Sequence, residues 1–190
     1  MKFLKNIILL LLTLFVIGAI YLATLDGSYD VAKTKLIEAD PIVVFNDLND
    51  YRNWKEWGPW YEQDSTIRVQ YADHTVGEGG AYTWTSDVEG GGRMKTLKVQ
   101  KPERLDQEMV FETPFGDMAS EVYWILNKIE TGTALTWGIK GELPFFSRFM
   151  ASGMTEQLGP MQERGLELFD KNLQKKLAVY LIDSVGVVDF

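Results

Sequence analysis

The sequence predicts an α+β protein, in which a curved antiparallel sheet of about seven strands wraps around a long C-terminal helix and a transmembrane helix comes first. Three observations lead to this expectation. The chain begins with a long uncharged apolar run, its middle alternates apolar and polar residues, and its last third repeats apolar residues every three or four positions. A period of two is typical of strands and a period near 3.6 of helices, so the elements can be assigned in order.

The N-terminal run, Asn6–Leu25, contains 20 residues without a charge. As a helix it would span about 30 Å, the thickness of the hydrocarbon core of a bilayer. A cleaved signal peptide is the alternative, but its apolar region is usually about 7–15 residues long and ends in an A-x-A-like site. Here Tyr21 stands two residues before Ala23, which fits that site poorly. An uncleaved anchor over residues 6–25 is therefore favoured.

The charges that flank this run predict its orientation. Lys2 and Lys5 precede it, and Asp26 and Asp30 follow it. Because the basic flank of a membrane helix stays in the cytoplasm, we expect residues 1–5 inside and the domain outside, in the periplasm of a double-membraned bacterium.

The remaining residues, 26–190, carry 17 basic and 27 acidic side chains, a net charge of −10. Nucleic acids and anionic lipid surfaces attract the opposite charge, so we expect no nucleic-acid partner. The absence of cysteine excludes disulfides, thiolate metal sites and cysteine nucleophiles. The length is sufficient for one domain with its own core, which we place at residues 26–177.

The domain is expected to open with a strand, Tyr29–Ile37, followed by two short helices. Asp40 can cap the first helix and Pro41 suits its first position, after which Val44, Phe45 and Leu48 form one apolar face. The second short helix, Tyr51–Trp57, ends at Gly58-Pro59.

Six further segments have the period of strands. In Leu105–Thr113, for example, Leu105, Met109 and Phe111 share one face, which predicts a sheet with one apolar side. The six segments are Ile67–Tyr71, Ala81–Ser86, Met94–Gln100, Leu105–Thr113, Ser120–Ile129 and Thr133–Gly141.

A long helix over Phe145–Leu177 is expected to cover that side, because its apolar residues recur at helical spacing. Gly159-Pro160 predicts a kink or break inside it. The final residues, 178–190, are strand-like, and we interpret them as a C-terminal extension with which a further domain begins.

The chain from about Tyr29 to Leu177 resembles the START-like (SRPBCC) superfamily, in its polyketide cyclase/dehydrase branch, and more narrowly its membrane-anchored bacterial members. The resemblance rests on "ADPIVVFNDLNDYRNWKEWGPW", on "GTALTWGIKGELPF" and on Leu158-Gly159-Pro160-Met161 followed by Glu163-Arg164-Gly165-Leu166. It implies the helix-grip fold, in which the sheet and the long helix enclose a cavity and a Trp-rich short helix edges it. Some anchored members continue into a gyrase-inhibitor-like domain that binds small molecules.

Trp54, Trp57 and Trp60 are spaced by three residues around the Gly-Pro break. Trp54 and Trp57 lie one helical turn apart and therefore share a face. Two interpretations remain open: the rings plug the end of the domain as core, or they form the rim of a cavity and contact its ligand. Trp57 is the preferred rim residue, because the chain turns away immediately after it.

The cavity that the resemblance implies would be lined by large apolar side chains from the strands and the long helix. Such pockets suit lipids, polyketides and other hydrophobic molecules, and methionine adapts to varied ligand shapes. A tightly filled core would have the same sequence pattern. The candidate lining residues, besides the three tryptophans, are Tyr82, Trp84, Met109, Phe111, Trp124, Trp137, Met150 and Met154.

Catalytic and metal-binding patterns are scarce. The single histidine, His74, is expected in a solvated loop, and as a general base it would need Asp73 or Glu78 beside it. Carboxylates such as Asp87 and Glu89 lack the spacing of a Ca²⁺ loop. We therefore assign no catalytic residue, no metal and no cofactor.

The glycine clusters Gly77–Gly80 and Glu89–Arg93 lie between strands, where hairpin turns with positive φ explain them better than a phosphate loop does. Ionisable residues in or beside strands are expected to form surface ion pairs rather than to point inward. These residues are Arg93, Glu121, Lys140 and Glu142.

Three functions compete on the sequence alone. The first is a membrane-anchored binding module for a hydrophobic small molecule or lipid. The second is a cyclase- or hydrolase-like enzyme, and the third is a ligand sensor coupled to a further C-terminal domain. The family label does not decide between them, because fold does not fix function.

Overall fold

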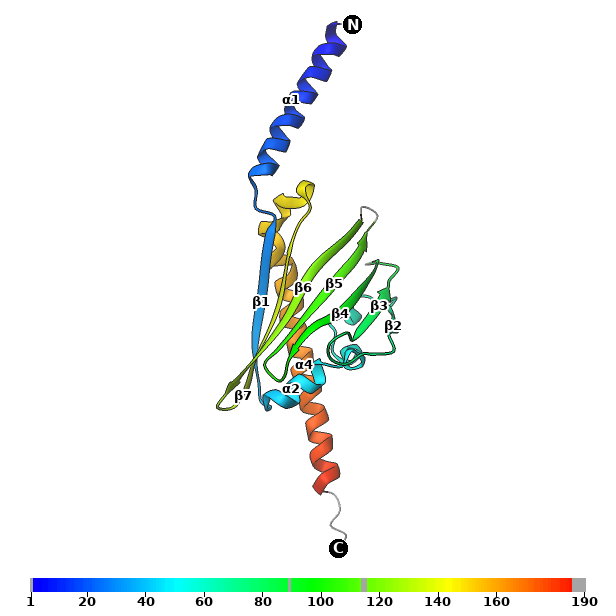
Figure 1. The fold of residues 1–190 in the computed structure, drawn as a ribbon, viewed down its shortest axis with the longest axis vertical. Helices are drawn as coiled ribbons and strands as arrows, with labels where there is room; N and C mark the ends of the chain where they lie inside the picture. The colour runs from blue at the N-terminus through cyan, green and yellow to red at the C-terminus, as the bar shows by residue number, and fades with distance from the viewer. Residues whose placement is uncertain (1, 89, 114–115, 186–190) are drawn as a thin grey trace.

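The computed structural model describes residues 2–88, 90–113 and 116–185, and it has the expected α+β helix-grip architecture (Figure 1). The N-terminal apolar run forms helix α1, Lys2–Thr24, which projects away from the sheet and contains no buried residue. Its length and composition are sufficient to cross a membrane.

In the described part of the chain, seven strands form one antiparallel sheet in the order β1-β7-β6-β5-β4-β3-β2. Consecutive strands from β2 to β7 are neighbours, and β1 pairs with β7. Because directly paired residues project to one face, Val31, Ile139 and Val122 lie side by side on the inner, apolar face. The strands are β1 (Ser28–Ile37), β2 (Arg68–Tyr71), β3 (Ala81–Thr85), β4 (Gly91–Gln100), β5 (Arg104–Thr113), β6 (Gly116–Ile129) and β7 (Gly132–Glu142).

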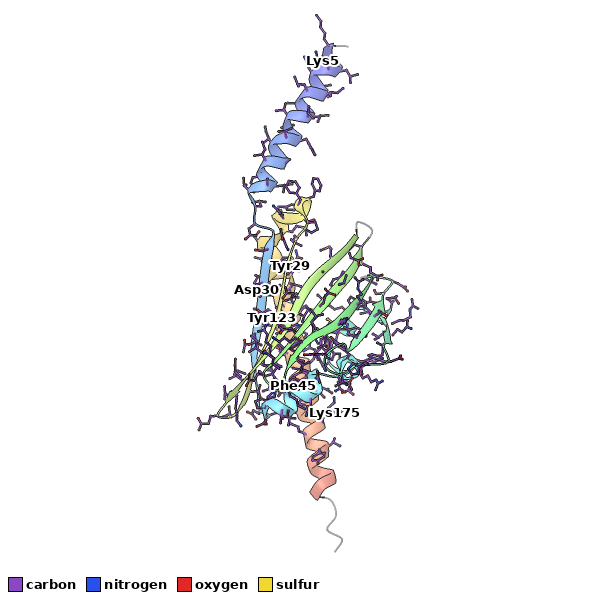
Figure 2. The ribbon with its side chains drawn as sticks, viewed as in Figure 1. Lys5, Tyr29, Asp30, Phe45, Tyr123 and Lys175 are labelled. Carbon is purple, nitrogen blue, oxygen red and sulfur yellow. The ribbon has the colours of Figure 1, made fainter. Side chains whose placement is uncertain are left out.

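Short helices connect β1 to β2. Helix α2, Pro41–Leu48, begins as expected, with the Asp40 carboxylate accepting a hydrogen bond from the Ile42 amide at 3.1 Å. It lies at the end of the sheet away from α1, where Phe45 is fully buried (Figures 1 and 2). A 3₁₀ helix, η1 (Tyr51–Glu56), and a short α-helix, α3 (Trp60–Gln63), follow it.

The long C-terminal helix differs from the prediction at both ends. The segment Phe145–Gly153 forms a separate 3₁₀ helix, η2, and α4 runs from Met154 to Val185. Of the kink or break predicted at Gly159-Pro160, the break is absent, because α4 is continuous through Pro160. The strand expected from residue 178 is wrong as far as residue 185, and residues 186–190 lie outside the described residues. Residues 178–180 are exposed, so packing does not hold them in the helix. The helix extends through them because the earlier turns are already formed, and each added residue then makes a further backbone hydrogen bond at little cost.

Helix α4 covers the inner face of the sheet. Leu166, Phe169 and Leu173 recur at helical spacing and are at most 2 % exposed. Gln162 on the same face is also fully buried, and its amide donates to the carbonyls of Val31 at 2.9 Å and Trp137 at 3.1 Å. These bonds connect α4 to both β1 and β7.

The outer face of the sheet is polar, and the ionisable strand residues form ion pairs there, as expected. Arg93 pairs with Asp117 at 2.9 Å, Lys140 with Glu121 at 2.8 Å, and Glu142 with Arg148 at 3.1 Å. Tyr123 donates to Asp30 at 2.8 Å across the same region (Figure 2).

The glycine clusters fit the turn interpretation only in part. Gly77, Gly79 and Gly90 have positive φ, as hairpin turns require. Gly91 and Gly92 instead belong to β4, which begins three residues before the predicted strand. Residue Glu89 lies outside the described residues.

Candidate functional site

A cavity of about 250 Å³ lies on the inner face of the sheet, beside the first turns of α4. Three parts of the chain line it, and most of the side chains are aromatic or aliphatic. The segment from η1 to the start of β2 contributes Trp54, Trp60, Tyr61, Gln63, Asp64 and Ile67; the strands contribute Val69, Tyr82, Trp84, Met94, Met109, Phe111, Val122, Trp137 and Ile139; α4 contributes Leu158 and Met161.

The strand wall follows directly from the pairing of β3, β4 and β5. Tyr82 lies opposite Met94, which lies opposite Met109, so the three side chains form one row across the inner face. One pair further along, Trp84 and Phe111 flank Gly92 in the same way.

Gly92 is required by this wall, because the Trp84 ring lies across it. A Cβ at position 92 would come within 2.2 Å of the Trp84 ring. Without that Cβ, the rings of Trp84 and Phe111 meet edge to face across β4, with centroids 5.4 Å apart. The glycine therefore serves close packing at the cavity, which the turn interpretation missed.

Several predicted residues line the cavity and others do not. Those that line it are Trp54, Trp60, Tyr82, Trp84, Met109, Phe111 and Trp137. Trp57, Trp124, Met150 and Met154 lie outside the lining. Whether the lining residues contact a ligand stays a prediction.

The tryptophan cluster divides between core and cavity. Trp57 is only 1 % exposed, and its ring meets those of Trp124 and Phe169 edge to face at 6.0 Å and 5.3 Å. The expectation that Trp57 forms the rim is therefore wrong. Trp60, which is only partly buried, takes the position at the cavity, because α3 turns the chain back after the Gly-Pro break.

Trp54 belongs to both the core and the cavity wall. It is 2 % exposed, and its indole Nε1 donates to the Leu48 carbonyl at 2.8 Å. By contrast, the buried Nε1 of Trp57 has no partner among the described residues. The two rings thus share burial but differ in hydrogen bonding.

Trp124 packs beside the cavity wall, directly opposite the lining residue Trp137 on the neighbouring strand. It is fully buried and stacks on Trp137, with centroids 4.8 Å apart and planes inclined by 16°. Its Nε1 donates to the Gln107 side chain at 2.9 Å, and this bond fixes the orientation of the ring.

Met150 and Met154 were also predicted to line the cavity, and they lie outside its lining. Their assignment assumed one helical stripe running from residue 146 to residue 165, but η2 is a separate 3₁₀ helix with a different rotation per residue, which removes Met150 from the stripe. Met150 is consequently 42 % exposed, and Leu158 and Met161 line the cavity instead. Met154 is the first residue of α4, one turn before Leu158, and it lies outside the lining.

Polar groups are few in this lining, and Asp64 is the only carboxylate among the described residues that form it. Its oxygens accept hydrogen bonds from the Ser86 hydroxyl, from the Thr66 amide at 2.7 Å and from the Thr66 hydroxyl at 2.6 Å. These bonds, that from Ser86 above all, lower the pKa of Asp64 below its usual value. Asp64 is therefore an ionised group that organises the α3–β2 connection.

The histidine lies away from the cavity. His74 is exposed in the connection between β2 and β3, as expected. Among the residues that the structure describes, no cluster of three or more histidine, cysteine or acidic side chains could hold a metal ion.

Some lining residues carried a sequence signal and others did not. Val122 and Ile139 lie in predicted strands, while Leu158 and Met161 lie in the predicted stripe, so periodicity could have identified all four. Gln63 and Asp64 had no such signal, because their positions depend on how the chain leaves α3.

Comparison with known proteins agrees with this architecture. A protein of Chromobacterium violaceum has 15% identity and a TM-score of 0.57 over 76% of this chain and 96% of its own. A protein of Mesorhizobium loti has 19% identity and a TM-score of 0.53 over 75% of this chain and 97% of its own. A protein of Mycobacterium smegmatis has 16% identity and a TM-score of 0.56 over 77% of this chain and 92% of its own. At these identities the likeness concerns the fold alone. No curated protein gives a significant match.

The family model described as "Polyketide cyclase / dehydrase and lipid transport" matches residues 28–174, which include all seven described strands and the cavity-lining part of α4. The chain therefore belongs to the polyketide cyclase/dehydrase and lipid transport family.

Proposed function

We propose that this protein is a membrane-anchored binding module for a hydrophobic small molecule or a lipid chain. The observation that carries the proposal is the cavity of about 250 Å³, with its aromatic and aliphatic walls. An apolar ligand gains about 25 cal/mol for each Å² of surface that it removes from water, and such a lining supplies apolar surface for that burial.

The size of the cavity narrows the class of ligand. Ligand pockets usually measure about 300–1,000 Å³, so this cavity, at about 250 Å³, lies just below that range. It suits a single acyl chain or a compact ring system. A two-chain lipid would require α4 to move away from the sheet.

The polar chemistry of the lining favours binding over catalysis. The Asp64 oxygens accept hydrogen bonds from Ser86 and Thr66, and these bonds lower the pKa of Asp64, which makes this carboxylate a weak proton acceptor. We therefore assign Asp64 a structural role and assign no catalytic residue.

The proposed anchor is α1, which has the length and the composition of a membrane span. Lys2 and Lys5 precede its apolar run and Asp26 follows it, an asymmetry that favours a cytoplasmic N-terminus and a periplasmic domain.

The test compares the same substitution at two positions of α4. Leu158→Trp places a larger ring in the cavity lining, whereas Leu177→Trp changes a partly buried residue of α4 outside the lining. Titration with a fluorescent fatty acid should show affinity reduced by about tenfold or more for Leu158→Trp, equivalent to about 1.4 kcal/mol. Leu177→Trp should leave the affinity within about twofold, a difference of about 0.4 kcal/mol.

Circular dichroism must show both variants folded. Equal affinities for the two variants, or no saturable uptake by the unmodified protein, would contradict the proposal.

A further inference from the structure

The 3₁₀ helix η2 carries an exposed apolar patch, formed by Phe146, Phe149 and Met150, which we name the η2 patch. These side chains are 68 %, 59 % and 42 % exposed. Among the described residues after α1, the exposed phenylalanines are these two. Residues three apart in a 3₁₀ helix eclipse one another, so Phe146 and Phe149 project from the same side. Contiguous exposed apolar patches are typical of surfaces that contact a membrane or another protein.

The η2 patch is positioned by the chain that leaves α1. The Gly27 carbonyl accepts a hydrogen bond from the Leu143 amide at 2.9 Å, just before η2 begins. The Arg148 side chain lies against Gly27, where a Cβ would be 2.8 Å from the Arg148 Cγ. Arg148 also pairs with Glu142 at 3.1 Å and lies 5.6 Å from the centroid of the Phe145 ring. Helix η2 therefore lies beside the end of α1 (Figure 1).

We propose that the η2 patch is a lipid-contact surface, which enters the headgroup layer of the membrane that α1 crosses. This inference rests on the anchor role proposed for α1. The apolar run ends at Leu25, and the headgroup layer on each side of a bilayer is about 5–8 Å thick. Gly27, and η2 with it, therefore falls within that layer. Aromatic side chains are enriched at this depth, because their rings favour the boundary between lipid and water.

Continuity with α1 makes the bilayer a better occupant than a second copy of the chain. A stable interface between two proteins usually buries about 800 Å² on each partner, more than three side chains provide. The charges beside the η2 patch predict how the contact depends on lipid. Asp26 and Glu142 are acidic and Arg148 is paired, so burial of apolar surface, and not attraction to anionic lipid, drives the contact.

The contact also places the cavity near the membrane. Helix α4 starts at Met154, directly after η2, and its residues Leu158 and Met161 line the cavity. Lipid contact by the η2 patch therefore fixes the start of α4 close to the bilayer surface. A hydrophobic ligand would have a short path between the membrane and the binding site.

The experiment uses nitroxide labels on the full chain, reconstituted in vesicles of zwitterionic phosphatidylcholine. The chain contains no cysteine, so single-cysteine variants carry one label each. Met150→Cys leaves both phenylalanines of the patch in place, and Phe149→Cys probes the patch itself. Leu36→Cys is the control, because Leu36 is 64 % exposed and lies eight residues along β1 from Ser28, roughly 26 Å away at about 3.3 Å per residue. Leu14→Cys reports on α1.

Collision rates with oxygen, which concentrates in lipid, and with a water-soluble nickel complex measure the depth of each label. We expect the labels at 150 and 149 to collide at least about threefold more with oxygen, relative to nickel, than the label at 36. The result should not change with added salt, because burial of apolar surface drives the contact. A contact driven by electrostatic attraction would instead weaken as salt screens it.

A water-like ratio at 149 and 150, with a lipid-like ratio at 14, would overturn the η2 proposal and leave the anchor intact. A water-like ratio at 14 would overturn the anchor itself. Labels at 149 and 150 shielded from both reagents and broadened by spin–spin coupling would identify a second copy as the occupant, and would also overturn the proposal.

Discussion

Trp54 and Trp57 allow a comparison in which burial is matched and hydrogen bonding differs. Their side chains are 2 % and 1 % exposed, so replacing either by phenylalanine removes similar buried ring area. The Trp54 Nε1 donates to the buried Leu48 carbonyl at 2.8 Å, whereas the Trp57 Nε1 is buried with no partner among the described residues. Phe at 54 therefore deprives a buried acceptor of its donor, and Phe at 57 removes an N–H that was already unsatisfied.

The expected difference follows from the cost of an unsatisfied buried group, about 1–3 kcal/mol. Trp54→Phe should lower the free energy of unfolding by about 1–3 kcal/mol more than Trp57→Phe does. Trp57→Ala serves as the reference for complete loss of the ring, with an expected cost of about 3–5 kcal/mol.

The assay is urea denaturation followed by far-ultraviolet circular dichroism, because tryptophan fluorescence would itself change with each substitution. The chain shortened to begin at Asp26 is suitable, since α1 contributes no buried residue and its removal should leave a soluble domain. Equal m-values would show that the variants unfold from comparable states. Equal destabilisation by the two phenylalanine substitutions, or a larger effect at 57, would refute the reasoning.

Two further predictions concern titration and the loop histidine. Burial raises the pKa of Tyr51 and Tyr82 above the value near 10 of the unfolded chain, so the stability these groups contribute is complete below pH 10 and is lost as the pH rises above it. The free energy of unfolding, obtained from urea titrations between pH 8 and 11, should fall above pH 10 by about 1.4 kcal/mol per pH unit for each tyrosine. Tyr51→Phe should make this dependence on pH less steep. An unchanged dependence in that variant would argue against a contribution from Tyr51. His74→Ala should alter the free energy of unfolding by less than about 0.5 kcal/mol, because His74 is exposed, and should leave fatty-acid uptake unchanged. Loss of uptake in this variant would place the histidine in the site.

The sequence by itself determined the fold class and the order of the elements. Asp40 and Pro41 predicted the start of α2, and the alternation of Leu105, Met109 and Phe111 predicted the inner face of β5. These predictions succeeded because caps and periodicity are local properties, which depend on neighbours in the chain. The long apolar helix α1 was predictable for the same reason, because its length and hydropathy are local properties, and its role as an anchor stays a proposal.

Only the tertiary structure decided which apolar residue belongs to the cavity and which to the core. Trp57 and Trp60 have the same residue type and equal spacing from their neighbours, yet Trp57 packs against Trp124 and Phe169, while Trp60 lies at the cavity. The difference arises from the turn after Gly58 and from the position of α4, both of which bring together residues far apart in the chain. The role of Gly92 was likewise decided by the tertiary structure, because it depends on the Trp84 ring of the neighbouring strand. A hydrophobic pattern states that a side chain is removed from water, and the packing of distant elements determines whether protein or empty space lies beside it.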